Sequence, residues 1–209
     1  MKHLVTLTAI WIVGMLNLYA APNPAVEFAK GQKTTWTSKD HPKAKGIKMK
    51  ISYPSTWKAA EGTRPNILQK FVGKSDTGMD MMSLTTRTLP APFDKELTAE
   101  QKTEVLAEDV VTDMLPAGAK LLSHKITKID GEACAMAEFL VVTERVGIKI
   151  AQKGMFFVIP RPGTLLLIQC GTGADASKGL AGLNARYDSV KNLYMLIGAS
   201  CVFVDKWEE

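Results

Sequence analysis

The chain has 209 residues, with 26 lysines and arginines against 21 aspartates and glutamates and a formal net charge of +5. This length suits one domain with a single hydrophobic core, preceded by a terminal extension. The charge is mild and the lysines lack interleaved aromatic residues, which argues against a nucleic-acid partner.

The first twenty residues have the layout of a secretory signal peptide. A basic start precedes an apolar run at residues 4–16, and the small residues Ala20 and Ala21 follow. The run is shorter than the roughly 20 apolar residues of a membrane-spanning helix, although an uncleaved anchor is the alternative. We predict cleavage after residue 20 or 21. No cysteine lies near that point to carry a lipid, so we expect a periplasmic or extracellular protein.

Residues 21–45 are rich in proline, lysine, threonine and glycine and have no sustained period, which predicts an extended basic arm. Seven lysines lie between Lys30 and Lys50. Such a lobe suits an acidic partner or an anionic membrane surface, and a solvated segment is the simpler interpretation. We expect one domain over residues 46–209.

The stretch GIKMKISYPSTW begins this domain. Apolar and polar residues alternate from Gly46 to Pro54, the period of a half-buried strand, and the proline ends the ladder. Two further strands at residues 67–72 and 81–88 flank the turn formers GKSDTG and predict a hairpin.

One amphipathic helix is predicted over residues 97–118. Apolar and threonine positions recur there at intervals of three and four, Thr98 and Gln101 have capping-box spacing, and Pro116 marks the end. From residue 120 to 170 the period returns to two, with turn signals that predict a four-stranded antiparallel meander. A closing helix follows, with its apolar face formed by Leu180, Leu183, Tyr187, Val190, Tyr194 and Ile197.

The three cysteines are predicted to be buried and reduced. A register in which Ile159 pairs with Thr164 puts Cys170 opposite Lys153, two strands from Cys134. That separation exceeds the limit for a disulfide, so any bridge must use Cys201.

No catalytic, cofactor or metal motif stands out. The triplet DTG at residues 76–78 has no second copy, and GTGADASKG lacks the ending of a phosphate-binding loop. The only histidines after the signal peptide, His41 and His124, have no nucleophile motif nearby. Met79 and Met81 share a face, which we interpret as sheet cover rather than a copper site. We therefore predict no cofactor and no metal.

The order of elements, together with YPSTW at residues 53–57, resembles the family of PsbP and Mog1 proteins. The resemblance covers roughly residues 46–200 and implies an α+β fold, an α/β/α sandwich around a central antiparallel β-sheet. Members of that family are mostly non-enzymatic: they bind a protein partner, assist assembly of a complex, or hold an ion. No family binding residue matches this chain position by position.

These observations favour an exported, non-enzymatic accessory or binding protein that engages a protein or envelope partner. The alternative is a small exported enzyme or secreted virulence factor with a cleft that the sequence does not reveal. Aromatic and basic residues gather near the start of the domain and form the predicted partner surface, although Trp57 also suits the core. This surface comprises Trp36, Lys43, Lys45, Trp57 and Arg64.

Overall fold

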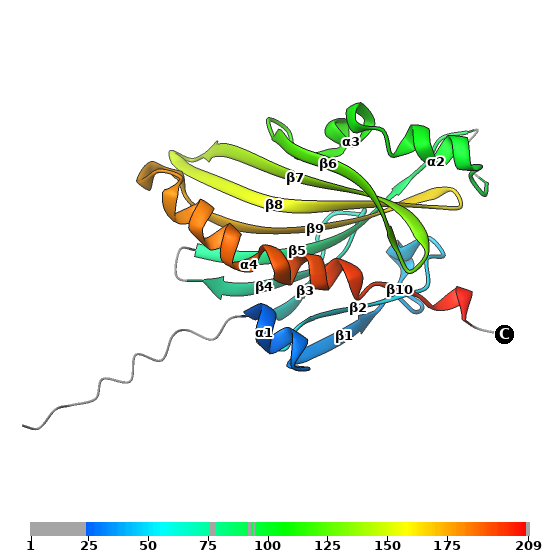
Figure 1. The fold of residues 1–209 in the computed structure, drawn as a ribbon, viewed down its shortest axis with the longest axis horizontal. Helices are drawn as coiled ribbons and strands as arrows, with labels where there is room; N and C mark the ends of the chain where they lie inside the picture. Colours follow the sequence, from blue (N-terminus) through cyan, green and yellow to red (C-terminus); the bar gives the residue numbers. More distant parts are fainter. Residues whose placement is uncertain (1–23, 76–77, 92, 94, 208–209) are drawn as a thin grey trace, which may run out of the picture.

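The computed structural model describes residues 24–75, 78–91, 93 and 95–207 (Figure 1). The predicted signal peptide lies outside the described residues.

A seven-stranded antiparallel sheet forms the centre of the molecule. Its strand order is β3-β4-β5-β9-β8-β7-β6. The strands are β3 (Lys58–Glu61), β4 (Ile67–Ser75), β5 (Gly78–Thr88), β6 (Lys120–Ile129), β7 (Glu132–Arg145), β8 (Ile148–Arg161) and β9 (Thr164–Asp175). The predicted hairpin, β4–β5, and the predicted four-stranded meander, β6 to β9, are both confirmed.

One predicted register is wrong by two residues. Arg161, rather than Ile159, pairs with Thr164. The turn therefore contains only Pro162 and Gly163, and the glycine has the positive φ of 65° that such a tight turn requires. As a result Cys170 lies opposite Met155 and not Lys153.

The predicted extended arm is also wrong, because residues 24–45 are folded onto the domain. They form helix α1 (Pro24–Ala29), strand β1 (Lys33–Thr37) and the 3-10 turn η1 (Pro42–Ala44). A small sheet results, in which β1 and β10 (Val202–Phe203) flank β2 (Met49–Pro54). Trp36 of β1 pairs with Ile51, and its ring lies 6.4 Å from that of Phe71.

The predicted single helix at residues 97–118 is two short helices, α2 (Ala99–Val105) and α3 (Glu108–Met114). The capping box of Thr98 and Gln101 is present at the start of α2. The break comes at Ala107, whose ψ of 152° is extended. There the carbonyl of Leu106 lies 3.0 Å from His124 Nε2 on β6. This tertiary contact occupies a carbonyl that a continuous helix would use itself.

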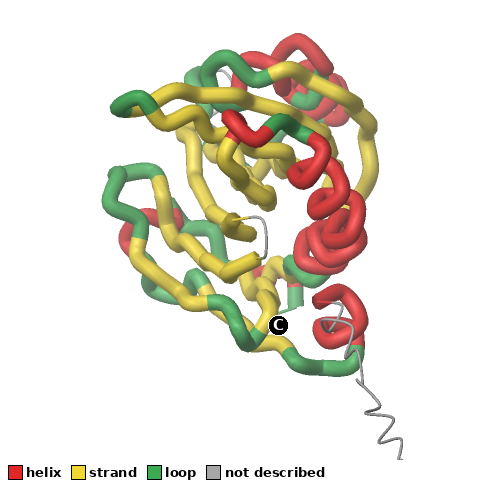
Figure 2. Tube along the Cα trace, turned by 90° about the vertical axis from the view of Figure 1, so that its left-hand side faces the viewer, coloured by secondary structure: helices red, strands yellow, loops and turns green. Residues whose placement is uncertain are grey.

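The helices cover both faces of the sheet and make an α/β/α sandwich, as predicted. Helix α4 (Ala181–Ala199) lies along one face (Figures 1 and 2) and, with the small sheet, closes the larger hydrophobic core. Helices α2 and α3 close a second core on the opposite face. We call these the α4 face and the α2/α3 face. No helix among the described residues is long and apolar enough to cross a membrane.

Candidate functional site

Two of the residues predicted to form a partner surface belong wholly or partly to the core. Trp57 is only 7% exposed, and its ring lies against Gly73, where a side chain would collide with it. Trp36 is half-buried between His41 and Phe71. Trp57 therefore offers little surface to a partner.

The three predicted basic residues do converge, near the end of β5. Lys43 Nζ donates a hydrogen bond of 2.6 Å to the Gly62 carbonyl, and Lys45 Nζ donates to the Thr88 hydroxyl. Arg64 lies in the loop between β3 and β4 and is exposed. Arg87 lies at the end of β5, near this loop. The sequence did not single it out, because it occupies what looks like a solvent-facing position of a strand.

Arg64 and Arg87 line an open groove of about 480 Å³ on the α2/α3 face. Its floor and walls come from β4, β5, β8 and β9 and from the chain that follows α3. The lining residues, which we call the arginine groove, are Arg64, Asn66, Ile67, Ser83, Thr85, Arg87, Met114, Pro116, Phe156, Leu167 and Gln169.

Strand alternation explains why these side chains share one face. Ser83, Thr85 and Arg87 are separated along β5 by residues that point to the α4 face. Ser83 pairs with Gln169, which in turn pairs with Phe156, so one row of neighbours crosses the groove floor. Helices α2 and α3 cover the strands on one side, and α3 ends at Met114, which leaves this row open.

The polar side chains of the arginine groove are unpartnered. Within the described part of the chain, neither guanidinium makes an ion pair, and Ser83, Thr85 and Gln169 make no side-chain hydrogen bond. The described residues that line this groove include no aspartate or glutamate, although Arg87 also lines a neighbouring hollow with Glu104 and Asp113. The groove therefore presents positive charge and free hydrogen-bonding groups beside the buried rings and methyls of Phe156 and Leu167.

The charged groups of the α4 face are, by contrast, paired with one another. Asp80, 1% exposed, accepts bonds from Arg186 and from the Tyr194 hydroxyl. Glu138 accepts bonds from Tyr187 Oη at 2.9 Å and from Lys191 Nζ at 2.6 Å. These contacts hold α4 on the sheet.

The same contacts determine the protonation states of Glu138 and Tyr187. Burial raises the pKa of Glu138, but the hydrogen bonds from Lys191 and Tyr187 outweigh it and hold that pKa below its ordinary value. Burial, reinforced by the charge of Glu138, raises the pKa of Tyr187. The tyrosine is thus a fixed donor and the glutamate a fixed acceptor, which suits a structural role.

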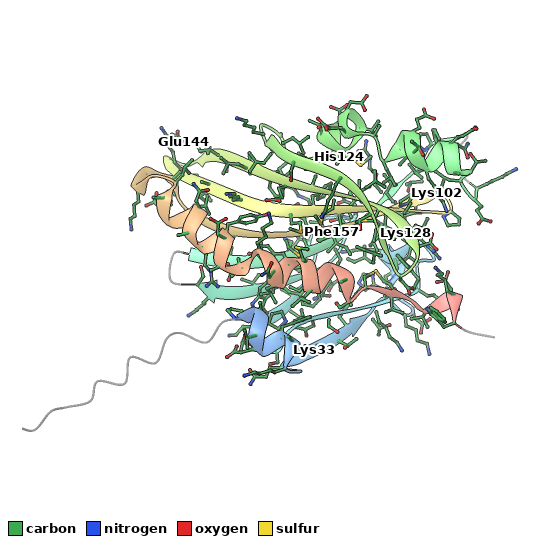
Figure 3. All side chains as sticks on the ribbon, viewed as in Figure 1. Lys33, Lys102, His124, Lys128, Glu144 and Phe157 are labelled. Carbon is green, nitrogen blue, oxygen red and sulfur yellow. The ribbon has the colours of Figure 1, made fainter. Side chains whose placement is uncertain are left out.

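Both histidines of the described part of the chain, His41 and His124, have structural partners outside the arginine groove. His124, labelled in Figure 3, contacts Leu106 as described above, and its Nδ1 lies 4.0 Å from Glu108 Oε2. His41 Nδ1 accepts a bond from the Lys43 backbone at the start of η1. The described residues contain no group of three histidines, cysteines or carboxylates placed to hold a metal ion.

The three cysteines are free and buried, as predicted. Burial raises the pKa of Cys134 and of Cys201 to about 12 and raises that of Cys170 further. A thiol so far from ionisation is a poor nucleophile, so these side chains act as small apolar groups.

Comparison with known proteins bears on the fold. No protein-family model matches the sequence, and no curated protein matches it significantly. The solution structure of cyanobacterial PsbP (CyanoP) from Synechocystis is similar, with a TM-score of 0.51 and 18% identity over 82% of this chain and 92% of that one.

Two other solved structures align with TM-scores of 0.47. LpqN, involved in cell envelope biogenesis of Mycobacterium tuberculosis, is 12% identical over 83% of this chain and 92% of its own. The Ran-binding protein Mog1p of Saccharomyces cerevisiae is 10% identical over 76% and 92%. Both alignments are too weak to add to the comparison. On the layered architecture and the match to CyanoP, this protein has a PsbP/Mog1-like fold.

Proposed function

We propose that this protein is an exported, non-enzymatic binding or accessory protein, and that it engages a protein or envelope partner through the arginine groove. The observation that supports this most is that, in the described part of the chain, Arg64 and Arg87 make no ion pair and the side chains of Asn66, Ser83, Thr85 and Gln169 make no hydrogen bond. Arginine is enriched among the residues that carry most of the affinity at protein interfaces.

The shape and chemistry of the groove support binding rather than catalysis. It is open to solvent, and the described residues that line it include no histidine, cysteine, aspartate or glutamate. The hydroxyls of Ser83 and Thr85 therefore have no neighbouring base to activate them. Arginine, hydroxyl and amide groups suit recognition of a polar partner instead.

Export is the second part of the proposal and rests on the first twenty residues. The expected result is a secreted or periplasmic protein whose intact mass lacks residues 1–20 or 1–21. Recovery of the full-length chain from the membrane fraction would contradict the export proposal and would not affect the proposal about the groove.

Filling the groove with a bulky side chain tests whether a partner binds there. Thr85 is half-buried in the groove, so Thr85→Trp should block access, whereas Thr34→Trp on exposed β1 adds the same bulk elsewhere. Both variants, expressed from the full chain, are immobilised and exposed to the native envelope fraction under chemical cross-linking.

The expected result is a cross-linked partner with the unmodified chain and with Thr34→Trp, and its loss with Thr85→Trp. Unchanged thermal unfolding of both variants is the control for folding. Equal capture by both variants would overturn the use of this groove.

A further inference from the structure

We propose that the arginine groove recognises an acidic peptide segment, in which a glutamate or aspartate lies beside an apolar residue. This inference rests on the proposed function and specifies the chemistry of the partner. The juxtaposition that carries it is that of the exposed Arg64 and Arg87 with the half-buried apolar side chain of Met114 in one groove.

Charge complementarity selects the acidic residue. Arg64 and Arg87 are both exposed and come from different elements, the β3–β4 loop and β5, yet they line one groove. Neither has an acidic neighbour among the described residues within ion-pair distance. A guanidinium binds a carboxylate through two parallel hydrogen bonds, which a lysine ammonium cannot reproduce.

The floor selects a peptide over a lipid tail. Ser83, Thr85 and Gln169 are half-buried and lie between the apolar floor residues. An acyl chain laid across them would take their polar atoms out of water without replacing their hydrogen bonds, which is unfavourable. A peptide backbone carries both N–H and C=O groups and can satisfy them.

A neighbouring hollow determines which end of the groove holds the acidic residue of the bound peptide and which end holds the apolar residue. This hollow of about 300 Å³ shares Arg87 and Met114 with the arginine groove and continues its apolar lining through Phe93. Its other side carries Glu104 and Asp113, which would repel a second acid there. The acidic residue of the segment therefore lies at the Arg64 end, and the apolar residue lies toward Met114.

Four fluorescein-labelled octapeptides test this recognition. They share a Gly-Ser frame and differ only in the central pair, which is Glu-Leu, Gln-Leu, Glu-Ser or Lys-Leu. Fluorescence anisotropy measures their affinity for the full chain at low and physiological salt. Glu-Leu should bind best, with Gln-Leu weaker by about tenfold or more because a charge-assisted hydrogen bond is lost.

Matched variants of the protein locate the binding. Arg64→Met with Arg87→Met should reduce Glu-Leu binding to the level of Gln-Leu. Lys39→Met with Lys50→Met changes the net charge equally at two exposed positions, one in the turn after β1 and one in β2, and should leave binding unchanged. Vesicles of phosphatidylcholine with phosphatidylglycerol should not displace the peptide.

The contrary results distinguish a failure of the acidic-peptide inference from a failure of the proposed function. Equal affinity for Glu-Leu and Gln-Leu, no binding by any peptide at millimolar concentration, or displacement by the vesicles would overturn the acidic-peptide inference. The proposed function would survive these results if Thr85→Trp still abolishes capture of the native partner. Conversely, a clear Glu-Leu preference with unaltered capture by Thr85→Trp would refute the proposed function.

Discussion

Replacing Gly198 with alanine sets two effects of opposite sign against each other. In an exposed helix, glycine to alanine stabilises by about 1 kcal/mol. Gly198, however, lies on the buried side of α4, against the ring of Phe157. A Cβ there would lie 2.6 Å from Phe157 Cζ and 2.8 Å from Cε1.

The size of the displacement decides which effect dominates. Carbon atoms in contact lie about 3.5–4.0 Å apart, so the helix or the ring must move by about 1 Å. Phe157 is only 2% exposed and is enclosed in the larger core, so the ring cannot turn away freely. Overpacking of this kind costs about 1–3 kcal/mol. We expect Gly198→Ala to lower the free energy of unfolding by up to about 2 kcal/mol.

Urea unfolding, followed by circular dichroism, measures this change. Gly182→Ala is the matched control, because Gly182 is exposed near the start of the same helix; it should stabilise. Phe157→Leu removes the ring atoms that collide, so Gly198→Ala should cost less in that background. A stabilisation by Gly198→Ala equal to that by Gly182→Ala would refute this reasoning.

Three further predictions concern buried groups. Asp80→Asn should lower the free energy of unfolding by about 1.5–3 kcal/mol in denaturant titrations, because the buried Asp80 loses its charged hydrogen bond with Arg186; a loss below about 1 kcal/mol contradicts this. Glu138→Gln should destabilise the protein at pH 7. Because the folded pKa of Glu138 is lowered, its contribution is present above the ordinary carboxyl pKa of about 4.3 and lost as pH falls through the folded pKa, so acid unfolding curves of variant and wild type should converge. A difference in stability between variant and wild type that widens as pH falls would contradict this expectation. The thiols should not react with Ellman's reagent in the native protein and should react stoichiometrically in urea, since all three are buried; rapid native labelling would exclude this arrangement.

Local signals were sufficient for much of the fold. Alternation from Gly46 to Pro54 identified β2, and the spacing of Thr98 and Gln101 identified the start of α2. Turn residues placed the hairpins of the meander because short connections leave few choices of pairing. Each of these features depends on neighbours in sequence, so no tertiary information was needed.

The errors occurred where a distant contact decides the local structure. Nothing between Glu104 and Glu108 breaks a helix by propensity, and the break at Ala107 accompanies a contact between Leu106 and His124 of β6. Strand β1 likewise exists through its pairing with β2 and the core contact of Trp36. A segment rich in lysine and proline reads as an arm when that pairing is unknown.

The arginine groove could be predicted only in part for a related reason. Arg64 stood out because basic residues are common at interfaces, but Arg87 and Thr85 read as ordinary solvent-side positions of a strand. Their significance comes from the length of α3, which ends at Met114 and leaves β5 and β9 uncovered. A surface defined by where a helix stops has no motif in the strands beneath it.

The two faces of the central sheet also differ in a way that bears on what the protein does. On the α4 face, Asp80 and Glu138 make charged hydrogen bonds to Arg186 and Lys191 that fix the helix. In the arginine groove, Arg64 and Arg87 stabilise no other part of the described chain through ion pairs. Their replacement should therefore cost little stability and much binding, whereas replacement of Asp80 should do the reverse. A residue whose loss affects binding alone is one that the fold does not require, and this separation distinguishes a recognition surface from a structural one.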